Sequence, residues 1–201
     1  MNPFRRTRLF LSVFALAFAL CATAFASEAQ DFVKSKQVEL TELVSKSKSV
    51  EDEKKVLAAF DSVLDYDALA KDTLKDFWDE RTPAEREEFS TLLKDLVRNA
   101  YRRNIKKTMG YDVDYTGETD ADLGKTIKTV AHNRKKVHEE PVDIDYLVHQ
   151  VGGQWRIRDI VTEGSSLVTN YRNQFRRIIK KHGFPELLKK MKAKRDKGDI
   201  D

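Results

Sequence analysis

The chain is poor in the residues that mark several classes of protein. Its 201 residues include one cysteine, Cys21, together with only four prolines and eight glycines. A single cysteine excludes an internal disulfide and a metal site built from cysteines. The sequence also lacks internal repeats and any stretch rich in proline or glycine that would separate two domains. We therefore expect a single folded domain.

Long apolar runs are also scarce. The one example, Leu9 to Leu20, is well short of the ~20 residues that a bilayer-spanning helix needs. Three arginines precede this run, and Ala24-Phe25-Ala26 follows it, which is the pattern of a secretory signal peptide. We expect residues 1–26 to be cleaved and residues 27–201 to form a soluble, exported domain. An uncleaved anchor and a lipid-modified Cys21 are the alternatives, and the bulky Leu20 disfavours the second.

A strong excess of one charge is missing as well. The formal net charge is +4 for the whole chain, and it falls to +1 once residues 1–26 are removed. A nucleic-acid-binding protein needs a net basic footprint. We therefore expect no nucleic-acid partner.

Helical spacing of apolar residues dominates residues 28–107. Phe32, Val33, Leu40, Leu43 and Val44 form one helical stripe. Two capping signals, at residues 49–52 and 82–85, predict the starts of further helices. The second of these helices is long and amphipathic, and a frayed basic tail is expected from residue 195 to the end.

After residue 110 the apolar period changes to two, which predicts about four antiparallel strands with one apolar face. Gly152-Gly153 predicts a two-residue hairpin turn. Gly164-Ser165-Ser166 ends the sheet and caps a helix, and Gly183 separates that helix from a last one. The order of elements indicates an α+β fold.

Motifs that carry catalysis or bind metal are absent. The four histidines are His132, His138, His149 and His182, and no pair has the i, i+4 spacing of a helical zinc site. The sequence contains no G-x-S-x-G, no phosphate-binding loop and no C-x-x-C. We therefore expect no metal and no cofactor.

Asp159 is the one carboxylate that falls on the predicted apolar strand face. It could be a general base in a cavity, because burial raises the pKa of a carboxylate. It could instead be structural, as a partner of Arg172 or of backbone donors at the sheet edge. We favour the structural interpretation, because an acid–base site usually brings several polar groups together.

The C-terminal stretch from Lys180 to Lys197 is rich in lysine. It is either a solvated helix face or a surface that attracts an anionic membrane or an acidic partner. We expect it to help docking and not to hold a ligand, because it lies beyond the predicted strands.

One ordered set of residues points to a known family. The set, in chain order, is Asp65–Ala70, Trp78, Thr82–Phe89, Tyr101, Trp155, Asp159, Gly164, Ser166, Asn170-Tyr171-Arg172, Phe175 and Gly183. In order and spacing it resembles the MlaC (toluene-tolerance) family of periplasmic phospholipid-binding proteins. One departure is Leu74-Lys75, where the family often has Leu-Gly, and it puts a local turn in doubt.

The resemblance implies a curved sheet wrapped by N- and C-terminal helices, similar to the cones of the nuclear-transport-factor (NTF2-like) type. It implies a monomeric carrier without catalysis, with phospholipid as cargo. The implied partners are an outer-membrane lipoprotein complex and an inner-membrane ABC transporter with a ring-shaped lipid-binding subunit. The alternative is a small periplasmic enzyme of the same fold that uses Asp159 as its base.

We expect bound acyl chains to contact apolar residues on the strand face and on the helices that cover it. These residues are Leu93, Val97, Tyr101, Val113, Tyr115, Ile127, Ile144, Tyr146, Val148, Trp155, Ile157, Val161, Tyr171 and Phe175. Two acyl chains carry about 30 methylene groups, whose transfer from water is worth roughly 24 kcal/mol. We therefore expect a cavity at or above the top of the usual range of ~300–1,000 Å³.

Overall fold

The computed structural model describes residues 27–197, apart from the side chains of residues 105–108. The expected signal peptide lies outside the described residues. The elements in chain order are α1 (Glu28–Lys46), α2 (Val50–Asp61), α3 (Tyr66–Leu74), the short 3-10 helix η1 (Lys75–Phe77), α4 (Pro83–Thr108), β1 (Tyr111–Ala121), β2 (Gly124–Asn133), β3 (Val142–Val151), β4 (Gln154–Thr162), β5 (Ser165–Ser166), α5 (Leu167–His182) and α6 (Phe184–Lys197).

Local capping chemistry sets the helix boundaries. Ser49 accepts a hydrogen bond from the backbone N–H of Asp52 and starts α2. At the start of α4, Glu85 accepts from the backbone N–H of Thr82, whose hydroxyl accepts from the N–H of Glu85. Both capping signals of the sequence are thus confirmed. The last helix continues to Lys197, into the segment that was expected to be frayed.

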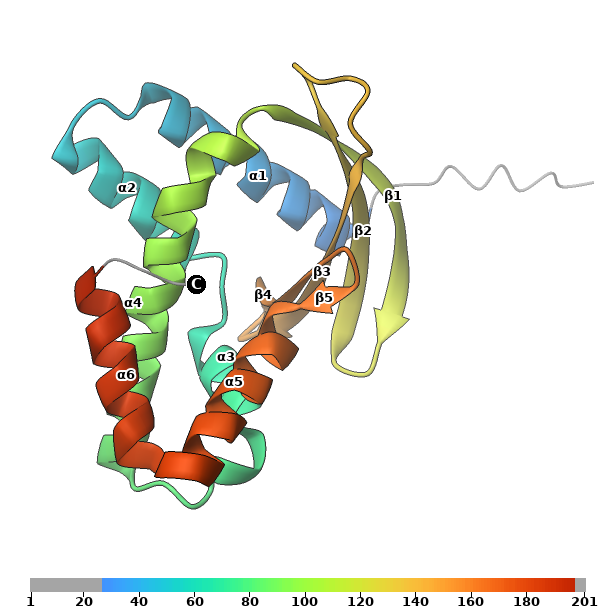
Figure 1. Cartoon of the computed structure of the whole chain (residues 1–201). Helices are drawn as coiled ribbons and strands as arrows, with labels where there is room; N and C mark the ends of the chain where they lie inside the picture. Colours follow the sequence, from blue (N-terminus) through green and yellow to red (C-terminus); the bar gives the residue numbers. More distant parts are fainter. Residues whose placement is uncertain (1–26, 198–201) are drawn as a thin grey trace, which may run out of the picture.

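The five strands form one antiparallel sheet in the order β1-β2-β3-β4-β5. Gly152 and Gly153 both have positive φ in the tight turn between β3 and β4, as the hairpin signal predicts. Strand β5 was not predicted, because two residues are too few to give a period. The sheet is curved and does not close, with its strands on one side of the molecule and most helices on the other (Figure 1).

Most of the largest fully buried side chains lie in the helical half. Phe89, Leu92, Leu93 and Leu96 of α4 are at most 2 % exposed, and they meet α5 and α6 through residues such as Phe175 and Leu187. The ring of Phe89 meets the ring of Phe175 edge-on at 5.4 Å between centroids. Close aromatic and aliphatic packing of this kind stabilises the helices around α4.

The segment between α2 and α3 joins the helices to the sheet. Val63 accepts a hydrogen bond from the N–H of Ile157 in β4, and Asp65 donates its N–H to the carbonyl of Ile157. This short parallel bridge covers part of the outer edge of β4, which protects unpaired backbone groups. Helix α1 packs against α2 on one side and against β2 and β3 on the other (Figure 1). None of the helices described between residues 27 and 197 has the length and apolar character of a membrane span.

Candidate functional site

An apolar cavity of about 350 Å³ lies between α1 and the sheet. Its strand wall comes from the beginning of β1 and β3 and the end of β2 and β4, and the end of α2 and one tyrosine of α4 complete it. The lining residues are Val33, Lys36, Gln37, Leu40, Thr41, Phe60, Val63, Leu64, Tyr101, Tyr111, Val113, Ala131, Val142, Ile144, Tyr146, Ile157, Ile160 and Thr162. Most of these side chains are apolar or aromatic, so the cavity suits a hydrocarbon ligand.

Polar groups of the lining are concentrated on α1. Lys36, Gln37 and Thr41 are partly or fully exposed, and Lys36 forms an ion pair of 2.7 Å with Glu39. Gln37 also accepts a hydrogen bond from the hydroxyl of Tyr115, which holds α1 against β1. This side of the cavity is where a polar part of an amphiphilic ligand would meet water.

Four aromatic side chains, Phe60, Tyr101, Tyr111 and Tyr146, line the cavity. The ring of Tyr101 stacks on Phe60 with 3.7 Å between centroids and an interplanar angle of 13°. The hydroxyl of Tyr101 is buried and has no hydrogen-bond partner within the described part of the chain. Burial raises the pKa of Tyr101 and also that of Tyr146, so both side chains stay neutral near pH 7.

The structure brings five of the expected lipid-contacting residues together in this cavity, namely Tyr101, Val113, Ile144, Tyr146 and Ile157. Their contact with lipid stays a prediction.

The other expected residues do not line the cavity. Leu93, Val97, Tyr171 and Phe175 pack in the helical core, and Ile127 and Val148 are fully buried at the other end of the sheet. Tyr115, Trp155 and Val161 are also absent from the lining. An apolar stripe shows that a side chain is buried, but not whether a cavity or a neighbouring side chain covers it.

A β-bulge explains why Val161 and Asp159 were placed on the wrong face. Leu147 pairs with Asp159 and Val148 pairs with Ile157, so Arg158 has no partner on β3. One extra residue reverses the alternation of side chains beyond it. Ile160 and Thr162 therefore line the cavity in place of Asp159 and Val161.

Asp159 is bonded to backbone donors and not to Arg172. One carboxylate oxygen accepts from the N–H groups of Ile160 and Val168, at 2.8 and 3.0 Å, and the other accepts from the hydroxyl of Ser166. Arg172 donates instead to the carbonyl of Asp72 at 2.8 Å. The expected Asp159–Arg172 pair was wrong, and the alternative of backbone donors at the sheet edge is the arrangement observed.

The contribution of α1 and of residues 60–64 to the site was not predicted from the sequence. Val33 and Leu40 belong to the apolar stripe noted in residues 28–46, but nothing in that stripe says that it faces a sheet. The cavity is also smaller than expected, at the low end of the usual range for ligands. The expectation of a large cavity was wrong, because α1 lies against β2 and β3 and the Phe60–Tyr101 stack forms part of the cavity wall.

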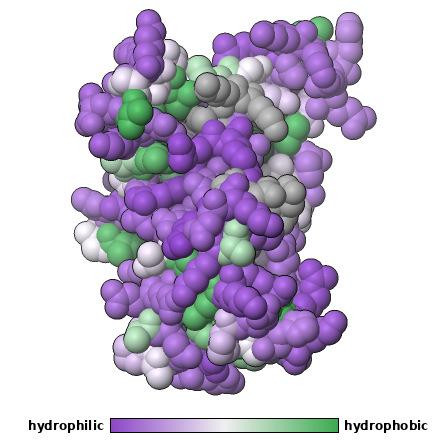
Figure 2. Space-filling view, turned by 60° about the vertical axis from the view of Figure 1, so that its left-hand side comes forward, coloured by the Kyte–Doolittle hydropathy of each residue, from purple (hydrophilic) through white to green (hydrophobic). Residues whose placement is uncertain are grey.

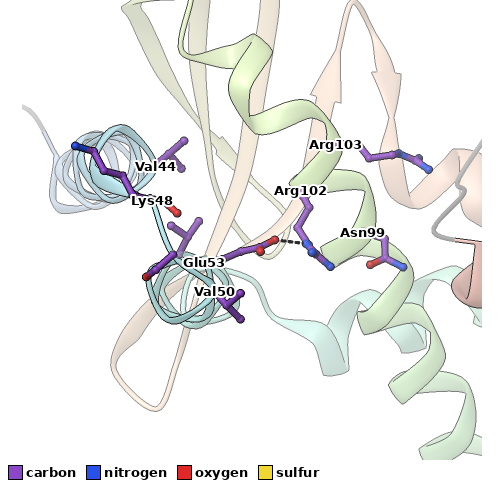
Figure 3. Close-up of a pocket in the computed structure, with 10 residues that line it drawn as sticks. Val44, Lys48, Val50, Glu53, Asn99, Arg102 and Arg103 are labelled. Carbon is purple, nitrogen blue, oxygen red and sulfur yellow. Dashed lines mark hydrogen bonds and ion pairs between the residues drawn. The ribbon is translucent and has the colours of Figure 1, made fainter.

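A second hollow of about 630 Å³, between the α1–α2 turn and α4, is lined by both polar and apolar side chains (Figure 3). Its ion pair joins Glu53 to Arg102 at 2.5 Å. Lys48 points away from Arg102, and Arg103 extends along the opposite side of α4 (Figure 3). Because these cations do not converge, the hollow is not an anion site.

No curated relative matches this chain. Among solved structures, it is similar to a protein from Ralstonia solanacearum that is described as phospholipid-binding and was solved in complex with a phospholipid. The TM-score is 0.70 at 22% identity, and the match covers 86% of this chain and 99% of that one. This likeness shows a common fold. The model of the family described as MlaC protein matches residues 32–193, which is most of the sequence and includes both walls of the cavity, and the chain therefore belongs to the MlaC family.

Proposed function

We propose that this protein is a soluble periplasmic phospholipid carrier that holds acyl chains in the cavity between α1 and the sheet. The observation that carries the proposal is an apolar cavity with a polar α1 rim in a chain of the MlaC family. The bound phospholipid of the Ralstonia solanacearum protein supports the same ligand class.

The proposed carrier moves phospholipid between an outer-membrane lipoprotein complex and an inner-membrane ABC transporter with a ring-shaped lipid-binding subunit. Such transfer would maintain the lipid asymmetry of the outer membrane. Export to the periplasm follows from the signal-peptide pattern of residues 1–26.

The cavity must widen to load a lipid. A methylene group needs about as much space as a water molecule, about 30 Å³, so 350 Å³ holds roughly a dozen of them. Two acyl chains carry more than twice that number. We infer that α1 is the wall that moves, because Ala29 and Val33 are its only fully buried residues.

The competing hypothesis, an enzyme that uses Asp159 as a base, has less support. Both oxygens of Asp159 already accept hydrogen bonds, and its side chain is not part of the cavity wall. A general base needs a carboxylate that can reach the substrate.

One experiment tests the carrier proposal directly. The exported protein is purified, extracted with organic solvent and analysed by mass spectrometry, and N-terminal sequencing checks cleavage after Ala26. We expect diacyl phospholipid at a near-equal molar ratio to protein. A protein that carries no lipid, and that takes up none from vesicles, would contradict the proposal.

A further inference from the structure

Charge is distributed unevenly along the described chain. Residues 164–197, which form α5 and α6, hold eleven lysines and arginines but only two carboxylates. Residues 27–163 hold 23 lysines and arginines against 29 carboxylates. The two C-terminal helices are therefore a strongly positive pole on a domain that is otherwise acidic.

The cations of this pole differ between its two helices. On α6, Lys189 and Lys190 pair with Glu186, Lys192 pairs with Glu88, and Arg195 pairs with Asp196. In α2, Lys54 and Lys55 each face a carboxylate one turn earlier. Helix α5 contains no carboxylate, and its exposed Arg176, Arg177 and Lys180 form no ion pair with any described residue. Unpaired surface cations raise the local potential and attract anionic partners.

A groove of about 500 Å³ lies between α4, α5 and α6, within this positive pole. Its floor is apolar: Ile178 is partly exposed, and the closely packed side chains of Leu96, Phe175, Leu187 and Met191 lie beneath it. Its rim carries Arg177, Lys190, Lys194 and Lys197, and no carboxylate lines it. On the side that Figure 2 brings forward, the surface is mostly hydrophilic with isolated apolar residues.

We propose that this groove docks an acidic amphipathic helix of a partner protein. The inference deepens the proposed function, on which it rests, because a carrier must meet a partner to deliver its lipid. The groove is separate from the lipid cavity, since no residue lines both.

The shape of the groove favours a helix over a membrane as its occupant. The floor lies between two helices, where a flat bilayer surface does not reach. An amphipathic helix inserts apolar side chains at i, i+3, i+4 and i+7 into such a groove and presents its polar flanks to the rim. The residues of α6 that line the groove lie between Leu187 and Lys197, a length that matches about three turns of a partner helix.

The probe is a designed peptide of about 16 residues with a leucine face flanked by glutamates, and its scrambled sequence is the control. Binding to the full-length, lipid-loaded protein is measured by fluorescence anisotropy at low and high salt. The rim variant is Arg177→Glu with Lys197→Glu. Its matched control is Arg176→Glu with Lys189→Glu, which makes the same charge change outside the groove.

We expect the rim variant to weaken peptide binding by at least about tenfold at low salt, and the control variant by less than about threefold. The floor variant Ile178→Ser should weaken binding at both salt concentrations, because its contribution is apolar. Thermal unfolding verifies that each variant is folded.

Equal weakening of peptide binding by the rim and control variants would contradict the groove as the binding site, because binding would then depend only on the overall charge. Binding of wild type to phosphatidylglycerol vesicles but not to the peptide would overturn it in favour of a membrane. A dimer in sedimentation experiments that the rim variant dissociates would assign the groove to a second copy. Bound phospholipid is quantified separately in each sample, so a failure of the carrier proposal is distinguishable from a failure of the groove.

Discussion

The helical half and the sheet half of this domain contain the same types of apolar residue but pack them differently. In the helical half, α4 packs against α5 and α6 so closely that Leu93 and Leu187 are fully buried. In the sheet half, Tyr146 and Ile157 face α1 across an apolar cavity of about 350 Å³. The first half stabilises the fold, and the second leaves space that a ligand can fill.

The difference follows from what covers each apolar face. Helices α5 and α6 are joined by Gly183 and lie against α4 with apolar rings from both sides. Helix α1 contributes only two fully buried residues, and its remaining lining residues are mixed polar and apolar. Substitutions in the two halves should therefore separate stability from lipid binding.

The largest effect is expected in the filled half. Leu93→Ala removes a fully buried side chain from the helical core, and such changes lower the free energy of unfolding by about 3–5 kcal/mol. Urea unfolding of the delipidated protein measures this loss of free energy of unfolding. The control Leu123→Ala, at a position 56% exposed, should change stability by less than about 0.5 kcal/mol. A loss below about 1.5 kcal/mol for Leu93→Ala would mean that the helical core is not close-packed.

A smaller effect is expected where the two halves join. Asp159→Asn weakens the charge-assisted bonds to Ile160, Val168 and Ser166, which should lower the free energy of unfolding by about 1–3 kcal/mol. Lipid content of the folded protein should stay the same. Because Arg172 bonds elsewhere, Asp159→Asn and Arg172→Gln should be additive in a double-mutant cycle. A coupling energy above about 0.5 kcal/mol would indicate an interaction between Asp159 and Arg172 that the structure does not contain.

Much of the fold was predictable, because it rests on local signals. The change of apolar period after residue 110, the caps at Ser49 and Thr82 and the paired glycines of the β3–β4 turn each act within a few residues. The bulge at Arg158 carries no such signal. The side chain of Arg158 makes a tertiary contact, in which its guanidinium bonds both oxygens of Asp72 on α3.

The site was less predictable than the fold for the same reason. Ile144 and Val148 lie on one face of β3 and have the same periodic pattern, yet Ile144 lines the cavity and Val148 is fully buried. Which of the two meets an open space depends on where α1 lies, and α1 is about a hundred residues away in the sequence. The periodicity of a single sequence does not indicate where a helix so far away in the chain packs on the sheet.

A backbone change in the helical half should increase stability by about 1 kcal/mol. Lys75 ends α3 with φ 47° and ψ −112°, so the turn is formed despite the departure from Leu-Gly. This region favours glycine, and Lys75→Gly should relieve strain there. The matched change Lys71→Gly, inside α3, should instead lower stability by a similar amount. Thermal unfolding measures the change in stability of each variant. A change of the same sign for Lys75→Gly and Lys71→Gly would contradict backbone strain at Lys75.

Substitution of Ile144 by aspartate is expected to have the smallest effect on stability and the largest effect on the amount of bound lipid. In the lipid-free protein an Ile144→Asp carboxylate faces a cavity large enough for water, so the free energy of unfolding should fall by less than about 1 kcal/mol. An acyl chain would have to displace that water and leave the charge unpaired, which costs several kcal/mol, so lipid should be lost.

The control Val148→Asp, on the same face of the same strand, should instead prevent folding, because neighbouring side chains fill the space around Val148. Urea unfolding and mass spectrometry of extracted lipid measure the two quantities on the same samples. A folded Ile144→Asp protein with full lipid occupancy would show that the acyl chains lie elsewhere, and Ile144→Leu, which keeps the cavity apolar, should retain its lipid.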